Sequence, residues 1–158
     1  KTPILFHRDL HGFSPKTESK TLAAALTEQL VFVHLNQKQK SSSGIQQYKT
    51  QKTKHRELFK SSCKKIEALS VEMASCTELT RFLELMRLHE TIISELLELP
   101  AVQPKHFSDF KGQIKSLGAW GGDFVLAGSK ELNSDQIKAY FNSNGYGTSL
   151  SYSEMVLI

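Results

Sequence analysis

The sequence has few of the residues that would tie it to metal, redox or membrane chemistry. Its 158 residues include two cysteines, Cys63 and Cys76, which lie thirteen positions apart and form no Cys-x-x-Cys pattern. This spacing indicates free thiols in a reducing compartment. No apolar run approaches the roughly 20 residues that a membrane span requires. We therefore expect a cytoplasmic globular protein with no metal site.

The length predicts one ordinary domain. A chain of 158 residues can bury roughly 70% of its unfolded surface and folds without a disulfide or a metal. The first residue is Lys1 rather than methionine, and we expect further sequence upstream of it.

Charge is distributed unevenly along the chain, although the net charge is only +4. Residues 36–65 carry nine Lys or Arg against one acidic residue, whereas residues 67–98 carry seven Glu against two Arg. The basic block could attract nucleic acid, anionic lipid or phosphorylated small molecules. It could equally form a solvated helix face that the acidic stretch balances, and the sequence leaves both interpretations open.

The first two thirds of the chain predict two strands and two long helices. Strands are expected over residues 2–8 and 30–36, with a short helix within residues 21–29 between them. A long helix should begin near Ser43, and a second, capped by Thr77, should end before Pro100. Two helices of about twenty residues joined by a short turn indicate an antiparallel pair.

The last third predicts strands over residues 113–117, 123–128 and 148–158, with a helix over residues 134–144 before the last strand. The resulting order is strand, long helices, strand, strand, helix, strand. This is the order of a split βαβ, or ferredoxin-like, α+β fold, in which one antiparallel sheet carries helices on one face.

The stretch IKSLGAWGGDF places Gly118, Gly121 and Gly122 within five positions, around the single tryptophan of the chain. Two glycines would satisfy a tight hairpin between the flanking strands. A third reduces side-chain bulk, so that a backbone or a phosphate can approach closely. A structural turn and a ligand-facing loop both remain open on these residues alone.

The segment IKSLGAWGGDFVLAG resembles the third motif of the GHMP kinases, a family that includes galactokinase and the homoserine, mevalonate and phosphomevalonate kinases. Trp120 replaces a glycine of that motif, and Leu117 replaces a small hydroxyl residue. With FVHLNQKQKSSSGI, the chain is similar to a bacterial subgroup named for its GYDIA sequence and associated with isoprenoid synthesis. The positions that match the motif are Lys115, Gly118, Ala119, Gly121, Gly122 and Asp123.

The resemblance implies two anion-binding segments. The loop Gly118, Ala119, Trp120, Gly121, Gly122, Asp123 would face phosphate groups, with Lys115 beside it. The segment LNQKQKSSSG is also similar to a Ser-rich segment of diphosphomevalonate decarboxylases, which would place Lys38, Ser41, Ser42 and Gly44 near the phosphate or carboxylate of the acceptor. Hydroxyls and amides at a helix start form an anion site, but a plain N-cap explains the serines as well.

The parts of a GHMP kinase that bind nucleotide are missing from this sequence. It contains neither a Pro-x-x-x-Gly-Leu-Gly-Ser-Ser loop nor the acidic GYDIA segment. We therefore expect residues 1–29 to be a strand and connector left from an absent N-terminal domain, and residues 30–158 to be the C-terminal domain. The catalytic residues would lie in the absent half. Asp123 is not expected to be the base, because an aspartate after Gly-Gly usually bonds its own turn.

The full-length protein is thus expected to phosphorylate mevalonate or phosphomevalonate with ATP and Mg²⁺, whereas this chain alone should be inactive. Its expected partners are the small-molecule substrate and the N-terminal GHMP domain, with a homodimer left open and no membrane. A phosphomevalonate-type decarboxylase and a non-catalytic GHMP relative are the alternatives. An RNA-binding ferredoxin-like module is less favoured, because the predicted central strands lack paired aromatic side chains for base stacking.

Overall fold

A four-stranded antiparallel sheet forms the centre of the fold. The computed structural model describes residues 4–7, 16–36, 41–118 and 123–156, and for residues 41–44 it describes the backbone alone. The strands are β3 (Leu30–His34), β4 (Gln113–Leu117), β5 (Phe124–Gly128) and β6 (Ser149–Ser151), in the order β4-β5-β3-β6. Every neighbouring pair is antiparallel. The predicted α+β class is confirmed, and the strand order is that of a split βαβ unit.

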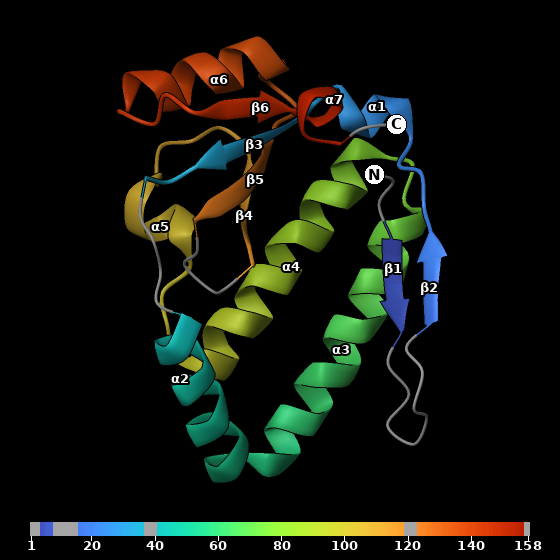
Figure 1. Ribbon diagram of the computed structural model, residues 1–158, viewed down its shortest axis with the longest axis vertical. Coiled ribbons are helices and arrows are strands. Elements are labelled where there is room, and N and C mark those ends of the chain that lie inside the picture. The colour runs from blue at the N-terminus through green and yellow to red at the C-terminus, as the bar shows by residue number, and fades with distance from the viewer. Residues whose placement is uncertain (1–3, 8–15, 37–40, 119–122, 157–158) are drawn as a thin grey trace.

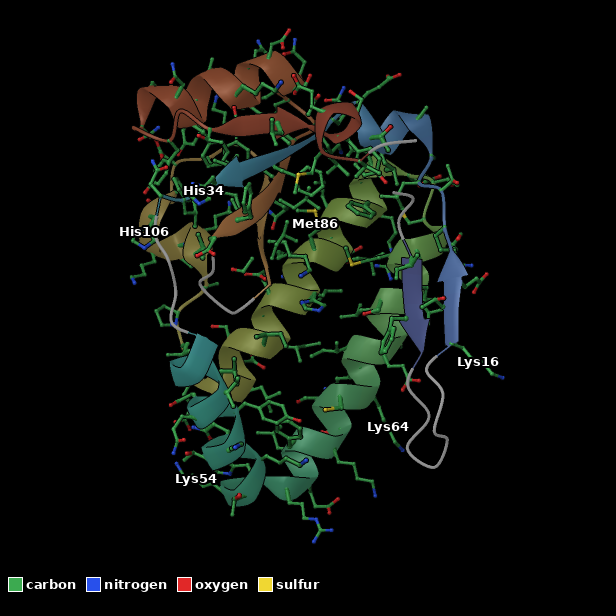
Figure 2. All side chains as sticks on the ribbon, in the orientation of Figure 1. Lys16, His34, Lys54, Lys64, Met86 and His106 are labelled. Atoms are coloured by element: carbon green, nitrogen blue, oxygen red, sulfur yellow. The ribbon has the colours of Figure 1, made fainter. Side chains whose placement is uncertain are left out.

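Helices cover both faces of this sheet, so the expectation of helices on one face was wrong. Val31 and Val33 pack with residues of α5 (Val102–His106) and α6 (Ser134–Ser143). Leu30 packs on the opposite side, in a cluster with Met86 of α4 (Leu79–Leu97) (Figure 2). The run LVFV has no polar alternation, which is typical of a strand buried on both faces.

The long helical region contains three helices rather than two. α2 (Ser41–Lys54) and α3 (Arg56–Ser75) are separated at His55, where φ is −129° and ψ is 56°. α2 also begins two residues before the predicted Ser43. α3 and α4 form the predicted antiparallel pair, and α2 folds back beside them (Figure 1). The N-cap of α4 is Glu78 rather than the predicted Thr77, and it makes no side-chain capping bond.

The N-terminal residues form a hairpin that the sequence predicted only in part. β1 (Ile4–His7) lies within the predicted strand and pairs antiparallel with β2 (Lys16–Ser19). β2 was not predicted, because its sequence KTES is polar and all four residues are exposed. The hairpin lies beside α3 (Figure 1). The predicted short helix is α1 (Ala24–Thr27), which buries Leu26 against the α4 side of the core.

The C-terminal strand is shorter than the predicted range of residues 148–158. After β6 the chain turns into α7 (Tyr152–Met155). Ser151 and Glu154 form a capping box, in which each side chain bonds the backbone of the other. Such a box favours a helix start and ends the strand there.

The basic block lies mainly at the exposed ends of α2 and α3. Lys54 is the last residue of α2, far from the sheet, and Lys64 lies near the middle of α3 (Figure 2). Both side chains are exposed, and the Lys54 ammonium lies 3.7 Å from a Glu98 carboxylate oxygen. The exposure of both lysines and the ion pair to Glu98 support the interpretation of a solvated helix face whose positive charge is partly balanced by acidic residues.

Candidate functional site

The two predicted anion-binding segments meet the sheet at the same end. The backbone N–H of Leu35, directly after β3, donates to the carbonyl of Asp123, directly before β5, at 2.7 Å. His34 lies opposite Phe124 in the antiparallel register, and Leu117 at the end of β4 lies opposite the same residue. Residues 37–40 therefore follow β3, and residues 119–122 precede its neighbour β5. The two segments adjoin the same end of the sheet, although they are far apart in sequence.

Gly118 has a conformation that suits the predicted close approach. Its φ is +69°, in the left-handed region where residues with a Cβ are strained. No atom of the described residues lies within 4 Å of the position that a Cβ would take. Of the other predicted loop residues, Asp123 is described, whereas Ala119, Trp120, Gly121 and Gly122 lie outside the described residues. Their role as a phosphate loop stays a prediction.

The predicted Ser-rich segment forms the start of a helix. α2 begins at Ser41, so Ser41, Ser42 and Gly44 all lie in its first turn, and this turn contains no acidic residue. The first amides of a helix lack carbonyl partners within the helix and can bind an anion. Lys38 lies outside the described residues. A plain N-cap and an anion site both remain compatible with this placement.

Asn36 fixes the direction in which the chain leaves β3. Its φ of 53° is left-handed, and its Nδ2 donates to the carbonyl of Gly145 at 3.3 Å. Its Oδ1 lies 3.2 Å from Nδ1 of His34, whose ring packs against Phe124 with centroids 4.9 Å apart. These contacts fix the backbone directly before residues 37–40.

Lys115, the predicted lysine beside the glycine loop, lies between β4 and α4. Its Nζ donates to the carbonyl of Ser116 at 3.1 Å. Burial lowers the pKa of Lys115, and the negative charge of Glu90 opposes that shift. Lys115 therefore belongs to a partly buried polar cluster, which we define as His89, Glu90, Lys115 and Ser116. Its role as an anion ligand stays a prediction.

Glu90 is the most unusual member of the polar cluster. Its side chain is only 5% exposed, and its Oε2 accepts a hydrogen bond from Ser116 Oγ at 3.2 Å. Its Oε1 is buried and has no hydrogen-bond partner among the described residues. Burial raises the pKa of Glu90 to about 7, against the opposing effects of Lys115 and Ser116. The carboxyl group thus has an ionisation equilibrium near neutral pH.

The pKa of His89, the neighbour of Glu90 in α4, is shifted in the opposite direction. Burial, together with the positive charge of Lys115, lowers the pKa of His89 to about 4. Its Nδ1 is buried and lacks a hydrogen-bond partner within the described part of the chain. The imidazole is therefore neutral at pH 7.

The sequence interpretation missed Glu90 because it treated the seven glutamates of residues 67–98 as one solvated set. A signal was present, however. Glu90 lies four residues after Met86 and seven before Leu97, at helical spacing on the apolar side of α4. A carboxylate on the apolar stripe of an amphipathic helix is a candidate for a buried functional group.

A pocket of about 360 Å³ lies beside Glu90, between α4, α5 and the start of β4. The exposed residues Arg87, Thr91 and Ser108 form part of its wall. Gln103 of α5 donates from Nε2 to the carbonyl of Gly112 at 3.0 Å and accepts from the N–H of Ile114 at 2.9 Å. These two bonds join α5 to the edge of β4 and fix one wall of the pocket.

The pocket and the glycine segment lie toward opposite ends of β4. Gln113 and Ile114, at the start of the strand, line the pocket, whereas Gly118 follows its last residue. A rise of about 3.3 Å per residue separates the two strand ends by roughly 13 Å. They are two candidate sites rather than one.

Within the described ranges, no group of three or more His, Cys, Asp or Glu side chains is placed to hold a metal ion. In the same parts of the chain, no helix combines the length and the apolar composition needed to cross a bilayer.

Comparison with known proteins identifies a similar fold but no family. No family model matches the chain, and no curated protein is significantly similar to it in sequence. Among solved structures, the Lin0012 protein of Listeria innocua superposes with a TM-score of 0.65 at 13% identity. The match covers 83% of this chain and 39% of that protein. At this identity the likeness shows a shared fold alone, and the chain spans well under half the length of its structural neighbour.

Proposed function

We propose that this chain is the substrate-side half of a GHMP-type kinase that phosphorylates mevalonate or phosphomevalonate with ATP and Mg²⁺. One observation carries the proposal: Leu35 and Asp123 are hydrogen-bonded to each other, at the ends of the Ser-rich and the glycine-rich segments. Both segments resemble GHMP motifs, and a shared phosphate site requires them to lie at the same end of the sheet.

The described residues fit the phosphate groups that such a reaction handles. Phosphoryl transfer depends mainly on positioning and on neutralising charge, so amides and cations aimed at phosphate are the main requirement. The first turn of α2 offers helix amides, and Gly118 offers backbone that no side chain of the described residues covers at the Cβ position. In this proposal the N-terminal domain supplies the nucleotide loop, the Mg²⁺ ligands and the catalytic base.

The proposal predicts a specific loss of activity in a Gly118→Ala variant. The protein with its natural upstream sequence should consume ATP in the presence of mevalonate or phosphomevalonate. Gly118→Ala forces a Cβ into the left-handed region, which costs about 1–2 kcal/mol, and displaces backbone that approaches phosphate. We expect kcat/KM to fall by at least about tenfold, which corresponds to about 1.4 kcal/mol of transition-state stabilisation.

Gly147→Ala is the matched control, because Gly147 is exposed and a Cβ there would meet, among the described residues, only Asn142 Oδ1 at 3.6 Å. It should retain full activity. Absence of ATP turnover on both substrates, together with absence of Mg-ATP binding to the full-length protein, would exclude a kinase. Release of CO₂ from a phosphorylated mevalonate would instead favour the decarboxylase alternative.

A further inference from the structure

The pocket beside Glu90 borders a buried carboxyl group whose hydrogen bonding is incomplete. Glu90 is 5% exposed, and only its Oε2 has a hydrogen-bond partner among the described residues. A buried polar atom left without a partner destabilises the structure that contains it. Oε1 is closed to solvent, so a molecule in the pocket can supply the missing donor only if the carboxyl group of Glu90 turns toward the pocket, which Glu90 also lines.

Arg87 provides a cation on the same wall of the pocket. It lies three residues before Glu90 in α4, which places both side chains on neighbouring parts of one helix surface. The nearby Glu84 is paired with Arg81 at 2.6 Å, and Arg87 makes no ion pair within the described part of the chain. Its exposed guanidinium is therefore available to a bound anion.

The balance of charge selects the class of ligand. Arg87 and Glu90 are the lining residues that carry charge, and Lys115 lies close to Glu90 without lining the pocket. Because Glu90 carries at most one negative charge, these three groups together leave an excess of positive charge around the pocket. A ligand with a single cationic group would increase that excess. An organic anion would neutralise it, and a hydroxyl group on the same molecule could donate to the carboxylate.

We propose that the pocket between α4, α5 and β4 binds a small organic anion that carries a hydroxyl group. The carboxyl group of Glu90 turns toward the pocket so that Oε1 accepts a hydrogen bond from the ligand hydroxyl, and the anionic group lies against the guanidinium of Arg87. The hydroxyls of Thr91 and Ser108 on the exposed wall add polar contacts. A volume of about 360 Å³ is small for a ligand pocket and suits a metabolite of a few carbon atoms.

This site needs no nucleotide and lies toward the end of β4 away from the glycine segment, so it does not depend on the proposed kinase function. A binding experiment on this chain without ATP therefore tests it separately. The probes are three pairs of compounds that differ by one hydroxyl: glycerate and propionate, malate and succinate, and 3-hydroxy-3-methylglutarate and 3-methylglutarate. Each is titrated into ¹⁵N-labelled protein, and the amide shifts are followed.

We expect saturable shifts of the Thr91, Gln103 and Ile114 amides for at least one hydroxylated compound. Its Kd should be about tenfold lower than that of its partner without the hydroxyl, because only the hydroxylated compound can form the hydrogen bond to Glu90. Equal affinity within every pair, or no saturable binding up to about tens of millimolar, would overturn the proposal.

Two variants distinguish the contact of the hydroxyl with Glu90 from the contact of the anionic group with Arg87. Glu90→Met keeps the approximate volume but removes the acceptor, so it should abolish the preference for the hydroxylated member of each pair. Arg87→Met lies at an exposed position and should weaken both members equally. Glu95→Gln, an exposed glutamate on the same helix, is the control and should change neither affinity. A hydroxyl preference that survives in Glu90→Met, or an affinity unchanged in Arg87→Met, would also overturn the proposal.

Discussion

Glu90→Gln should raise the free energy of unfolding more at about pH 8 than at about pH 5. The difference between its effects at the two pH values should be about 2–3 kcal/mol. The folded-state pKa of about 7 lies above the ordinary value of 4.5, because burial disfavours the charged carboxylate. The folded protein therefore holds this proton more tightly than the unfolded chain. The stability that the folded protein gains from protonated Glu90 is fully present below about pH 4.5 and is lost as the pH rises through about 7. Glutamine cannot ionise and removes that loss.

The wild-type protein alone would not reveal this effect, because His89 acts in the opposite direction. Its pKa falls from 6.5 to about 4 in the folded state, so its contribution to stability increases as the pH rises between these values. Urea denaturation of wild type and Glu90→Gln at the two pH values isolates the Glu90 contribution. Glu95→Gln should show no pH-dependent difference. An equal change in stability at both pH values for Glu90→Gln would show that Glu90 is not buried as described.

Phe141→Ala should destabilise the fold by about 3–5 kcal/mol, as expected for removing a large aromatic side chain from a core. Phe141 of α6 is 0% exposed, and its ring centroid lies 5.0 Å from that of Phe107 and 5.4 Å from that of Phe110. It joins α6 to the segment after α5 on one face of the sheet. Urea denaturation measures the change.

Phe6→Ala is the matched control for this substitution. Phe6 lies on β1 and is 56% exposed, so its loss should change the free energy of unfolding by no more than about 0.5 kcal/mol. A loss below about 1 kcal/mol for Phe141→Ala would mean that α6 does not pack on the sheet as described.

The strands β3 and β4 were predictable because the residue patterns that favour them are local. Residues 113–117 alternate in burial and became β4 with the predicted bounds, and the apolar run from Leu30 became β3. Which face each helix covers depends on packing between distant segments, and periodicity within one segment does not report it. The end of β6 was misjudged for a local reason, since the capping box of Ser151 and Glu154 outweighed the β propensity of the residues that follow.

The candidate sites were less predictable from the sequence than the strands. The resemblance identified Gly118 and Lys115 as candidate anion-binding residues. It did not predict that Leu35 lies against Asp123, because this contact depends on the register between β3 and β5. Glu90 was hidden among many glutamates, because burial of a charged residue is a property of the folded chain. The pocket beside it combines residues of α4, α5 and β4, and no sequence motif joins these elements.

The central claim is that the segments after β3 and before β5 form one phosphate site. The most direct test follows the amide shifts of Asn36, Ser41, Gly118 and Asp123 while phosphomevalonate is titrated into the protein with its natural upstream sequence. If the claim holds, all four amides shift and saturate with a single Kd, and Gly118→Ala raises that Kd for all of them together. Saturation of one segment without the other, or no shift in either, would contradict it.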